Sequence, residues 1–423
     1  MALQSPSTEP PEFPRPPLNG HYGSKVLFNA ADEDIRNGIW GPWYWFAKCT
    51  GQLFAVVPGT GKYVTWLHHL PNVISIFLFV IRSIFLLYVM MKAKALSIFW
   101  SYVTVVFFMS LHAMVSAITL LKYKTDRFVP KVIAYMRKAS FDRMTPVPKM
   151  GIIRNIFTVL IFVVPSLVYI FECFIRYSND EEVFSEYYSG NSTFRNSIYG
   201  DMHFLYFFDA IIVLWGSFLS AAVMILYLLA NDALCREYAI FNKELTAHVK
   251  DGTITNLTNI KSFQSQLIDY LCMACYLNTV SNAIVNLTFM AGIMTQIAAQ
   301  FALYSFSAHM TGAQSTLYGI WTAQSILFLV YSLKKPSELH NMMTETKHLI
   351  WLDHGIWSKC SDQQVQQIAR NISERISAVD YASKGMTSTR AANYLFNAVL
   401  IVIPFFVDIL GGYKYVEPGL PAN

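Results

Sequence analysis

Several apolar blocks, each long enough to cross a lipid bilayer, constrain the fold of this chain more than any other feature. A span needs about 20 predominantly apolar residues, because roughly 30 Å of hydrocarbon is crossed at 1.5 Å per residue. Only 14% of the 423 residues are charged and 54% are hydrophobic, whereas soluble proteins carry about a quarter charged residues. Backbone polar groups cannot remain unpaired in lipid, so the spans must be helices. The sequence therefore predicts an all-α membrane protein.

Seven segments are predicted to span the membrane. They cover residues 71–91, 96–121, 152–175, 203–230, 276–306, 313–333 and 391–410. The fifth segment is rich in amides, namely Asn278, Asn282, Asn286, Gln296 and Gln300. So many amides on one helix indicate a face that contacts other helices or water and not lipid.

The segments between the spans suggest a domain organisation. Residues 1–37 are Pro-rich and lack the apolar core of a signal peptide, so we expect a disordered cytoplasmic tail. An aromatic interfacial or re-entrant lead-in is expected at 38–70, before spans one to six at 71–333 and the last span at 391–410. In this lead-in Trp40, Trp43 and Trp45 would lie at headgroup depth.

Two stretches outside the spans are predicted to be cytoplasmic helices, residues 231–275 and 334–390. Within the second, apolar residues recur every three or four positions and form one stripe: Val365, Ile368, Ile372, Ile376 and Val379. Such a stripe lies on the membrane or packs on other helices, and its low net charge favours packing. Residues 411–423 are expected to be an extracellular tail.

Basic residues determine the expected orientation. The segments assigned to the inside hold twenty-five Lys and Arg, and those assigned to the outside hold five. By the positive-inside rule, the N-terminus is cytoplasmic and the C-terminus extracellular. The glycosylation motif at Asn191 falls in a loop that this topology places outside. The net charge of +5 thus reflects membrane orientation and does not indicate nucleic-acid binding.

Three features together resemble a known receptor family. They are the inverted seven-span topology, the aromatic lead-in with Gly51 and Pro58, and a closing amphipathic-then-apolar helix pair joined through Gly385-Met386-Thr387. The chain resembles the insect gustatory and odorant receptor superfamily, including nematode relatives such as the serpentine receptor class R proteins. Of the motif that gustatory receptors carry in the last span, only Phe405 is present here.

The resemblance implies a ligand-gated, non-selective cation channel built as a homo- or hetero-tetramer in the plasma membrane of sensory neurons. The last span would line the pore, with Asn397 near its inner end and Asp408 near its outer end. Four copies of Asp408 would form a cation-concentrating ring, and Pro404 with Phe405 would form a kink and a hydrophobic gate. The alternatives are a hydrated Asp408 at the interface and a kinked packing helix.

A pocket for a small-molecule stimulus is expected in the outer half or middle of spans three to six. Its candidate residues are Glu172, Asp209, Trp215, Gln300, Tyr304, Tyr318, Trp321 and Gln324. Acidic residues within the membrane indicate a functional site by default, and Asp209 is the best single example. For the aromatic residues, the alternative is a core or lipid-facing position.

No catalytic set, metal site or cofactor motif is predicted, so an enzyme is not expected. Cys272 and Cys275 are interpreted as small core residues, because no second pair or histidine accompanies them. Two other functions stay open. One is a seven-span sensor of chemicals, light or peroxide that signals through a cytoplasmic partner or G protein. The other is a transporter, although paired broken helices are not visible.

Overall fold

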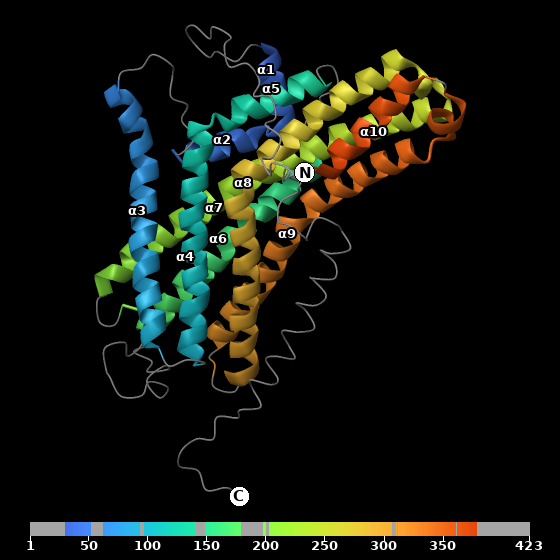
Figure 1. Cartoon of the computed structure of the whole chain (residues 1–423). Helices are drawn as coiled ribbons and strands as arrows, with labels where there is room; N and C mark the ends of the chain where they lie inside the picture. Colours follow the sequence, from blue (N-terminus) through green and yellow to red (C-terminus); the bar gives the residue numbers. More distant parts are fainter. Residues whose placement is uncertain are drawn as a thin grey trace, which may run out of the picture.

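Helices form every regular element in the part of the chain that the structure describes (Figure 1). The computed structural model describes residues 30–51, 62–93, 97–140, 149–178, 198–199, 203–306, 310, 312–360 and 362–378. The α-helices are α1 (Ala30–Ile39), α2 (Pro42–Cys49), α3 (Lys62–Lys92), α4 (Ile98–Thr125), α5 (Phe128–Ser140), α6 (Lys149–Ser178), α7 (His203–Lys250), α8 (Leu257–Phe306), α9 (Gly312–Trp351) and α10 (Gln363–Ala378).

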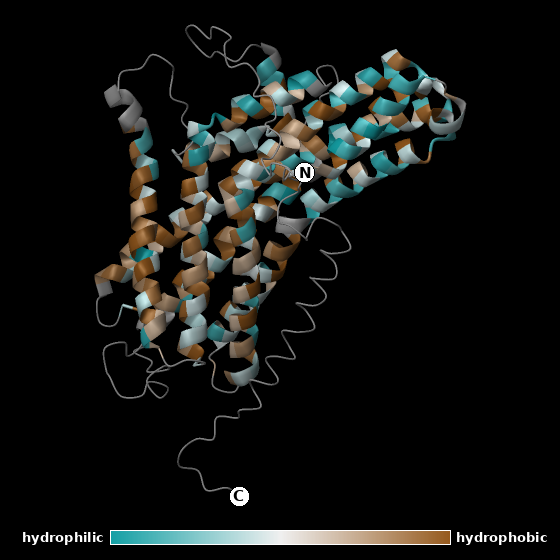
Figure 2. Ribbon diagram, viewed as in Figure 1, coloured by the Kyte–Doolittle hydropathy of each residue, from teal (hydrophilic) through white to brown (hydrophobic). Residues whose placement is uncertain are grey.

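Five of the described helices, α3, α4, α6, α7 and α8, are long and apolar enough to cross a membrane. They contain the first, third, fourth and fifth segments predicted from the sequence and most of the second, and Figure 2 shows their apolar residues gathered in one bundle. The sixth segment, 313–333, lies within α9, which is not among the five. The seventh segment lies outside the described residues.

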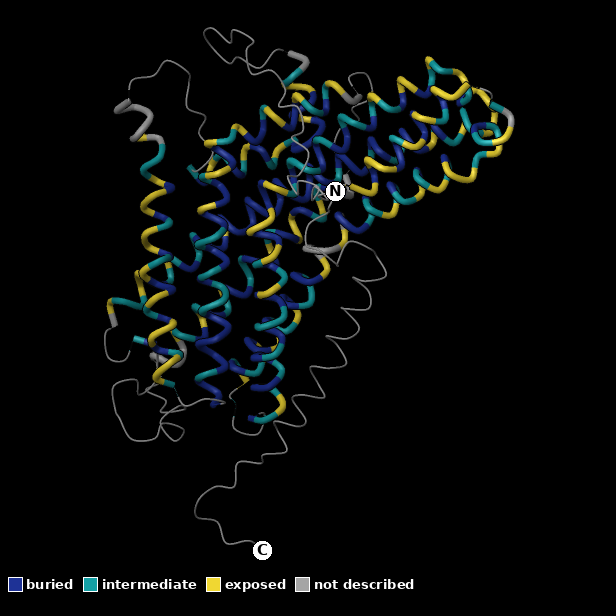
Figure 3. Tube along the Cα trace, viewed as in Figure 1, coloured by how far each residue is buried: buried dark blue, intermediate teal, exposed yellow. Residues whose placement is uncertain are grey.

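The bundle presents a broad apolar surface on α3, α6 and α7. Large side chains there are solvent-exposed, for example Phe77 at 62%, Phe174 at 67% and Phe207 at 68%. Figure 3 shows the exposed side of α3 as a repeating stripe along the helix. A soluble protein rarely exposes a continuous apolar surface of this size. The surface is what a lipid-facing side requires.

Helices α7 and α8 extend far beyond the length of a span. They contain 48 and 50 residues, so each is about 70–75 Å long at 1.5 Å per residue. A turn with Gly252 at φ +67° joins them, a conformation that glycine adopts without strain. We call the part of α7 and α8 that continues beyond the length of a span the extension. Within it, the ring of Tyr238 packs against Phe241 and Tyr270. The helical prediction for 231–275 is confirmed.

The predicted amphipathic helix is present as α10, which packs on the extensions of α8 and α9. Four residues of the predicted stripe are buried: Val365, Ile368, Ile372 and Ile376. Val379 lies outside the described residues. The expectation that this stripe packs on helices is therefore confirmed.

The aromatic lead-in differs from the expectation. Helix α1 begins at Ala30, inside the range assigned to a disordered tail. Packing stabilises this helix, because Ile35 and Ile39 lie one turn apart and both are buried. Trp40, expected at headgroup depth, is fully buried, and its indole Nε1 donates to the Leu226 carbonyl at 3.2 Å. Trp45, by contrast, is 52% exposed. Packing against α7 gives Trp40 both apolar contact and a hydrogen-bond acceptor.

Candidate ligand site

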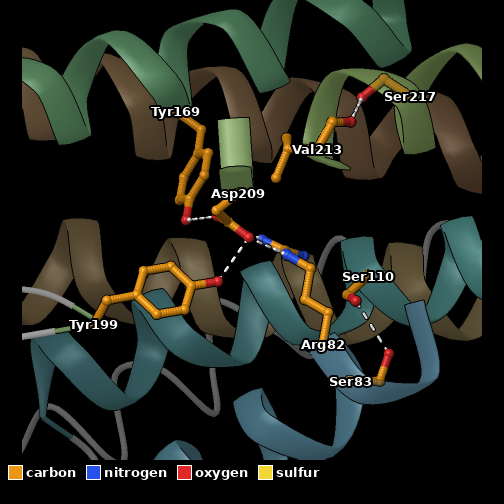
Figure 4. Close-up of polar contacts among 8 residues, drawn as sticks. All are labelled: Arg82, Ser83, Ser110, Tyr169, Tyr199, Asp209, Val213 and Ser217. Atoms are coloured by element: carbon orange, nitrogen blue, oxygen red, sulfur yellow. Dashed lines mark hydrogen bonds and ion pairs between the residues drawn. The ribbon is translucent and has the colours of Figure 1, made fainter. Parts of the chain in front are cut away.

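A buried ion pair joins α3 to α7 inside the apolar bundle (Figure 4). Arg82 Nε lies 2.6 Å from Asp209 Oδ1, and Arg82 Nη2 lies 3.2 Å from Oδ2. Both side chains are almost inaccessible to solvent, at 6% and 4% exposed. Charged residues in a membrane interior pair with one another because each alone is costly to desolvate.

Two tyrosine hydroxyls complete the coordination of the Asp209 carboxylate. Tyr169 in α6 donates to Oδ2 at 3.1 Å, and Tyr199 donates to Oδ1 at 2.7 Å. The Tyr199 ring also stacks on Phe85 of α3, with centroids 5.3 Å apart. Tyr199 belongs to the segment that precedes α7, so this cluster ties a loop residue to three helices. In Figure 4 the tyrosines approach the carboxylate from two sides.

A small cavity lies next to the ion pair, between α3, α4, α6, α7 and α9. About 30 Å³ of it is open to the centre of a water-sized sphere, which is enough for a water molecule but not for a drug-sized ligand. Apolar walls come from residues such as Phe79, Phe162 and Phe328, and polar groups come from Arg82, Ser110, His112, Ser166, Ser217, Ser220 and Gln324. The cavity combines aromatic walls with several convergent hydrogen-bonding groups.

His112 of α4 is the most connected polar residue at the cavity. Its Nδ1 lies 3.0 Å from Ser220 Oγ of α7, and its Nε2 lies 2.9 Å from Thr288 Oγ1 of α8. The ring also stacks on Phe328 of α9. The ring also packs on Phe162 of α6, so one imidazole bonds or packs against four neighbouring helices.

Three of the sequence-predicted pocket residues meet around Tyr102 of α4. The Tyr102 hydroxyl donates to Glu172 Oε2 at 3.2 Å, and its ring packs against Trp321 at 5.6 Å. Tyr318 contacts Trp321 edge to face and donates to the Ile98 carbonyl at 3.0 Å. Tyr102 also packs on Tyr169, which connects this group to the Asp209 cluster.

The other four predicted residues are dispersed. Gln324 lines the cavity and donates to the Ile161 carbonyl at 3.0 Å. Trp215 bonds Ser75 of α3 at 3.0 Å, outside the cavity lining. Gln300 is partly buried on α8, and Tyr304 is 58% exposed. Of the eight candidates, only Gln324 lines the cavity itself.

Sequence reasoning missed the residues that form most of the polar cavity wall. Arg82 was visible as the one charge in the first span, and an intramembrane arginine needs an acidic partner such as Asp209. His112 and the serines carry no spacing signal, because they come from separate helices. The pore candidates Asn397, Pro404, Phe405 and Asp408, and the glycosylation candidate Asn191, lie outside the described residues. Within the described ranges, no group of three or more His, Cys, Asp or Glu residues is placed to hold a metal.

Comparison with solved structures shows which fold this is. The chain is similar to the olfactory receptor OR5 of the insect Machilis hrabei, with a TM-score of 0.59, 10% identity, and coverage of 90% of this chain and 96% of that one. Against the same receptor in complex with eugenol, the TM-score is 0.64 at 10% identity, covering 90% of this chain and 98% of that one. The chain therefore has the fold of an insect olfactory receptor.

The sequence comparisons are more restricted. No curated protein matches the chain. A family model, described as a Caenorhabditis protein of unknown function, DUF267, matches residues 39–407. The match covers most of the chain, from the end of α1 to the segment predicted as the last span. The chain belongs to the Caenorhabditis family DUF267.

Proposed function

We propose that this protein is a chemosensory receptor that opens a non-selective cation channel when a small molecule binds. The observation that carries the proposal is the similarity of fold, which extends over 90% of this chain and nearly all of the olfactory receptor. In this proposal four copies assemble in the plasma membrane of a sensory neuron. The extensions of α7, α8 and α9 lie in the cytoplasm, and the predicted last span lines the pore.

The stimulus site in this proposal is the cavity beside His112. Its position among five helices suits a sensor, because a ligand there contacts elements that can move relative to one another. The walls favour a small and mainly apolar molecule with one hydrogen-bonding group. The Arg82 and Asp209 charges already neutralise each other, so a neutral ligand needs no further counter-ion. Because the cavity is small, binding displaces side chains that now line it.

The second candidate is a sensor that signals through a cytoplasmic partner. The long extensions of α7 and α8, which project well beyond the apolar bundle, would present the surface that such a partner binds. The two candidates share the ligand site and differ in whether the protein conducts ions by itself.

Current recordings from purified protein in planar bilayers separate these candidates. We expect cation currents that a panel of small neutral organic compounds activates. Replacing Ser217, which lines the cavity and bonds Val213 and Ser166, by valine should shift the concentration for half-activation. The matched control is Ser281→Ala, a buried serine bonded to Tyr123 and away from the cavity. Tetramers that pass no stimulus-dependent current would reject the channel and favour the partner-coupled sensor.

A further inference from the structure

Four buried polar atoms in the outer half of the bundle bond no other group in the described residues. They are Ser101 Oγ of α4, Gln296 Nε2 and Gln300 Oε1 of α8, and Trp321 Nε1 of α9. Ser101 and Trp321 are 0% exposed and Gln296 is 1% exposed. Buried polar atoms in native proteins almost always have a partner, because an unmade hydrogen bond costs the full desolvation of the group.

The register of α8 against α9 places Gln296, Gln300 and Trp321 at nearly the same height along the bundle. The two helices run antiparallel, and Ser325 of α9 bonds the Gln296 amide. One turn toward the outer end, four residues later on α8 and four earlier on α9, are Gln300 and Trp321. Because both helices rise equally per turn, the free atoms of Gln296, Gln300 and Trp321 lie within about one turn of each other.

Helix α4 brings Ser101 to the same level. Ser101, His112 and Tyr123 are spaced by eleven residues, close to three helical turns, so they share one face. Tyr123 bonds Ser281 and His112 bonds Thr288, both on α8. Continuing this progression places Ser101 opposite residues 295–299 of α8. On the α9 side, the Tyr102 ring contacts Trp321, so the three helices converge here.

We propose that this junction of α4, α8 and α9 is a binding site for an ordered water molecule. Water donates two hydrogen bonds and accepts two, and it makes about three when buried. The Trp321 N–H and the Ser101 hydroxyl can donate to it, and Gln300 Oε1 can accept from it. The free Nε2 of Gln296 donates to the water, in which case the Ser101 hydroxyl accepts from it, so that the water accepts two hydrogen bonds and donates two.

The two glutamines have small neighbours on α8. On α8 the neighbouring residues Ala298, Ala299 and Ala302 are small and buried. None of the four polar residues lines the cavity beside His112. The water site is therefore separate from the proposed ligand site and does not depend on the proposed function.

Thermal unfolding of the full-length protein in detergent tests the site through coupling between its members. Ser101→Ala and Trp321→Phe should each lower the midpoint temperature, because each leaves the water and the remaining groups with one bond fewer. The double variant should be lowered by about as much as the more damaging single variant, since the water is already lost. Phe301→Leu, an apolar control on α8, should add independently to either change.

Two results would overturn the proposal. One is a midpoint that rises in Trp321→Phe, which would show that the indole N–H had no partner at all. The other is strict additivity of Ser101→Ala and Trp321→Phe, which would show lost packing and not a shared ligand. An experimental map that resolves internal waters gives a direct check: density within hydrogen-bond distance of three of the four atoms supports the site, and its absence rejects it.

Discussion

At the scale of single residues, a buried ion pair and a close approach of helices stabilise the bundle. The Arg82–Asp209 pair takes two charges out of water, and the Tyr169 and Tyr199 hydroxyls satisfy the remaining capacity of the carboxylate. The sequence indicated Asp209 as a ligand contact, whereas the structure gives it a complete set of protein partners. Its direct role is therefore to join α3, α6, α7 and the segment before α7, and in the proposed receptor its effect on a ligand would be indirect.

Asp209→Asn should strongly destabilise the fold, because it leaves the Arg82 guanidinium buried without a counter-charge. Breaking one half of a buried pair typically costs about 3–5 kcal/mol, so we expect a large drop in the thermal midpoint. The double variant Arg82→Met/Asp209→Leu should recover much of that loss, since it removes both charges. A double variant that is no more stable than Asp209→Asn would argue against the pairing.

Gly216 of α7 marks a second residue-scale constraint, the close approach of helices. A methyl group added there would lie 2.7 Å from Ala113 Cβ of α4 and 3.0 Å from Phe79 of α3. Gly216→Ala should therefore destabilise the protein by about 1–3 kcal/mol through overpacking. Gly319→Ala of α9, where nothing lies within 4 Å, is the matched control and should be neutral or slightly stabilising. Equal midpoints for the two variants would contradict this packing.

At the scale of elements, α10 depends on packing more than on its own helical tendency. Its 16 residues are near the lower limit for a stable isolated helix, and its apolar stripe is buried against α8 and α9. Since α8 and α9 are also part of the membrane bundle, α10 contacts two helices that continue into the bundle. This arrangement suits an element that stabilises the extension.

Ile372→Lys should detach α10 from the extension. Ile372 is 1% exposed, and an unpaired charge at that position would cost several kcal/mol. Amide hydrogen exchange should then show loss of protection in α10 and in the facing parts of α8 and α9. Arg375→Glu, a larger change of charge on the exposed side of the same helix, is the control and should leave the protection intact. If both variants exchange alike, the stripe is not the docking face.

At the scale of the whole molecule, the bundle and its extension form two zones of different polarity. The bundle exposes apolar side chains on α3, α6 and α7, whereas the extension is rich in polar residues (Figure 2). The excess of basic residues predicts that the extension is cytoplasmic. The loop between α6 and α7 would then be extracellular, which gives the orientation a direct chemical test.

Glycosidase treatment of the protein expressed in animal cells should remove a mass shift that Asn191→Gln also abolishes. The reason is that glycans are added only on the lumenal side, where this topology places residue 191. A glycan at Asn256, in the turn between α7 and α8, would instead place the extension outside and reverse the orientation.

Asp408→Asn should lower single-channel conductance while leaving the concentration for half-activation nearly unchanged. A ring of carboxylates acts on ions within a screening length of about 8 Å at physiological salt. Ser217→Val should show the opposite pattern, because its side chain lines the cavity and not the predicted pore. An unchanged conductance in Asp408→Asn would mean that residue 408 does not face the ion path.

The sequence by itself determined the membrane class, five helices that are long and apolar enough to cross a membrane, and the two predicted extension helices. These features depend on local apolar runs and on periodicity, which short segments carry without reference to the rest of the chain. It did not predict that Trp40 is buried, because tertiary contacts decide this. Nor did it predict the cavity, whose wall combines single residues from five helices.

The contrast is clearest for Asp209 and His112. Residue type and position alone marked Asp209 as unusual, since an acid within a span is costly wherever it lies. Only the tertiary structure showed that Arg82 and two tyrosines satisfy it. His112 gave no signal at all, because its partners Ser220 and Thr288 lie 108 and 176 residues away. Pairings at such separations are set by how the helices pack, and a pattern read along the chain cannot contain them.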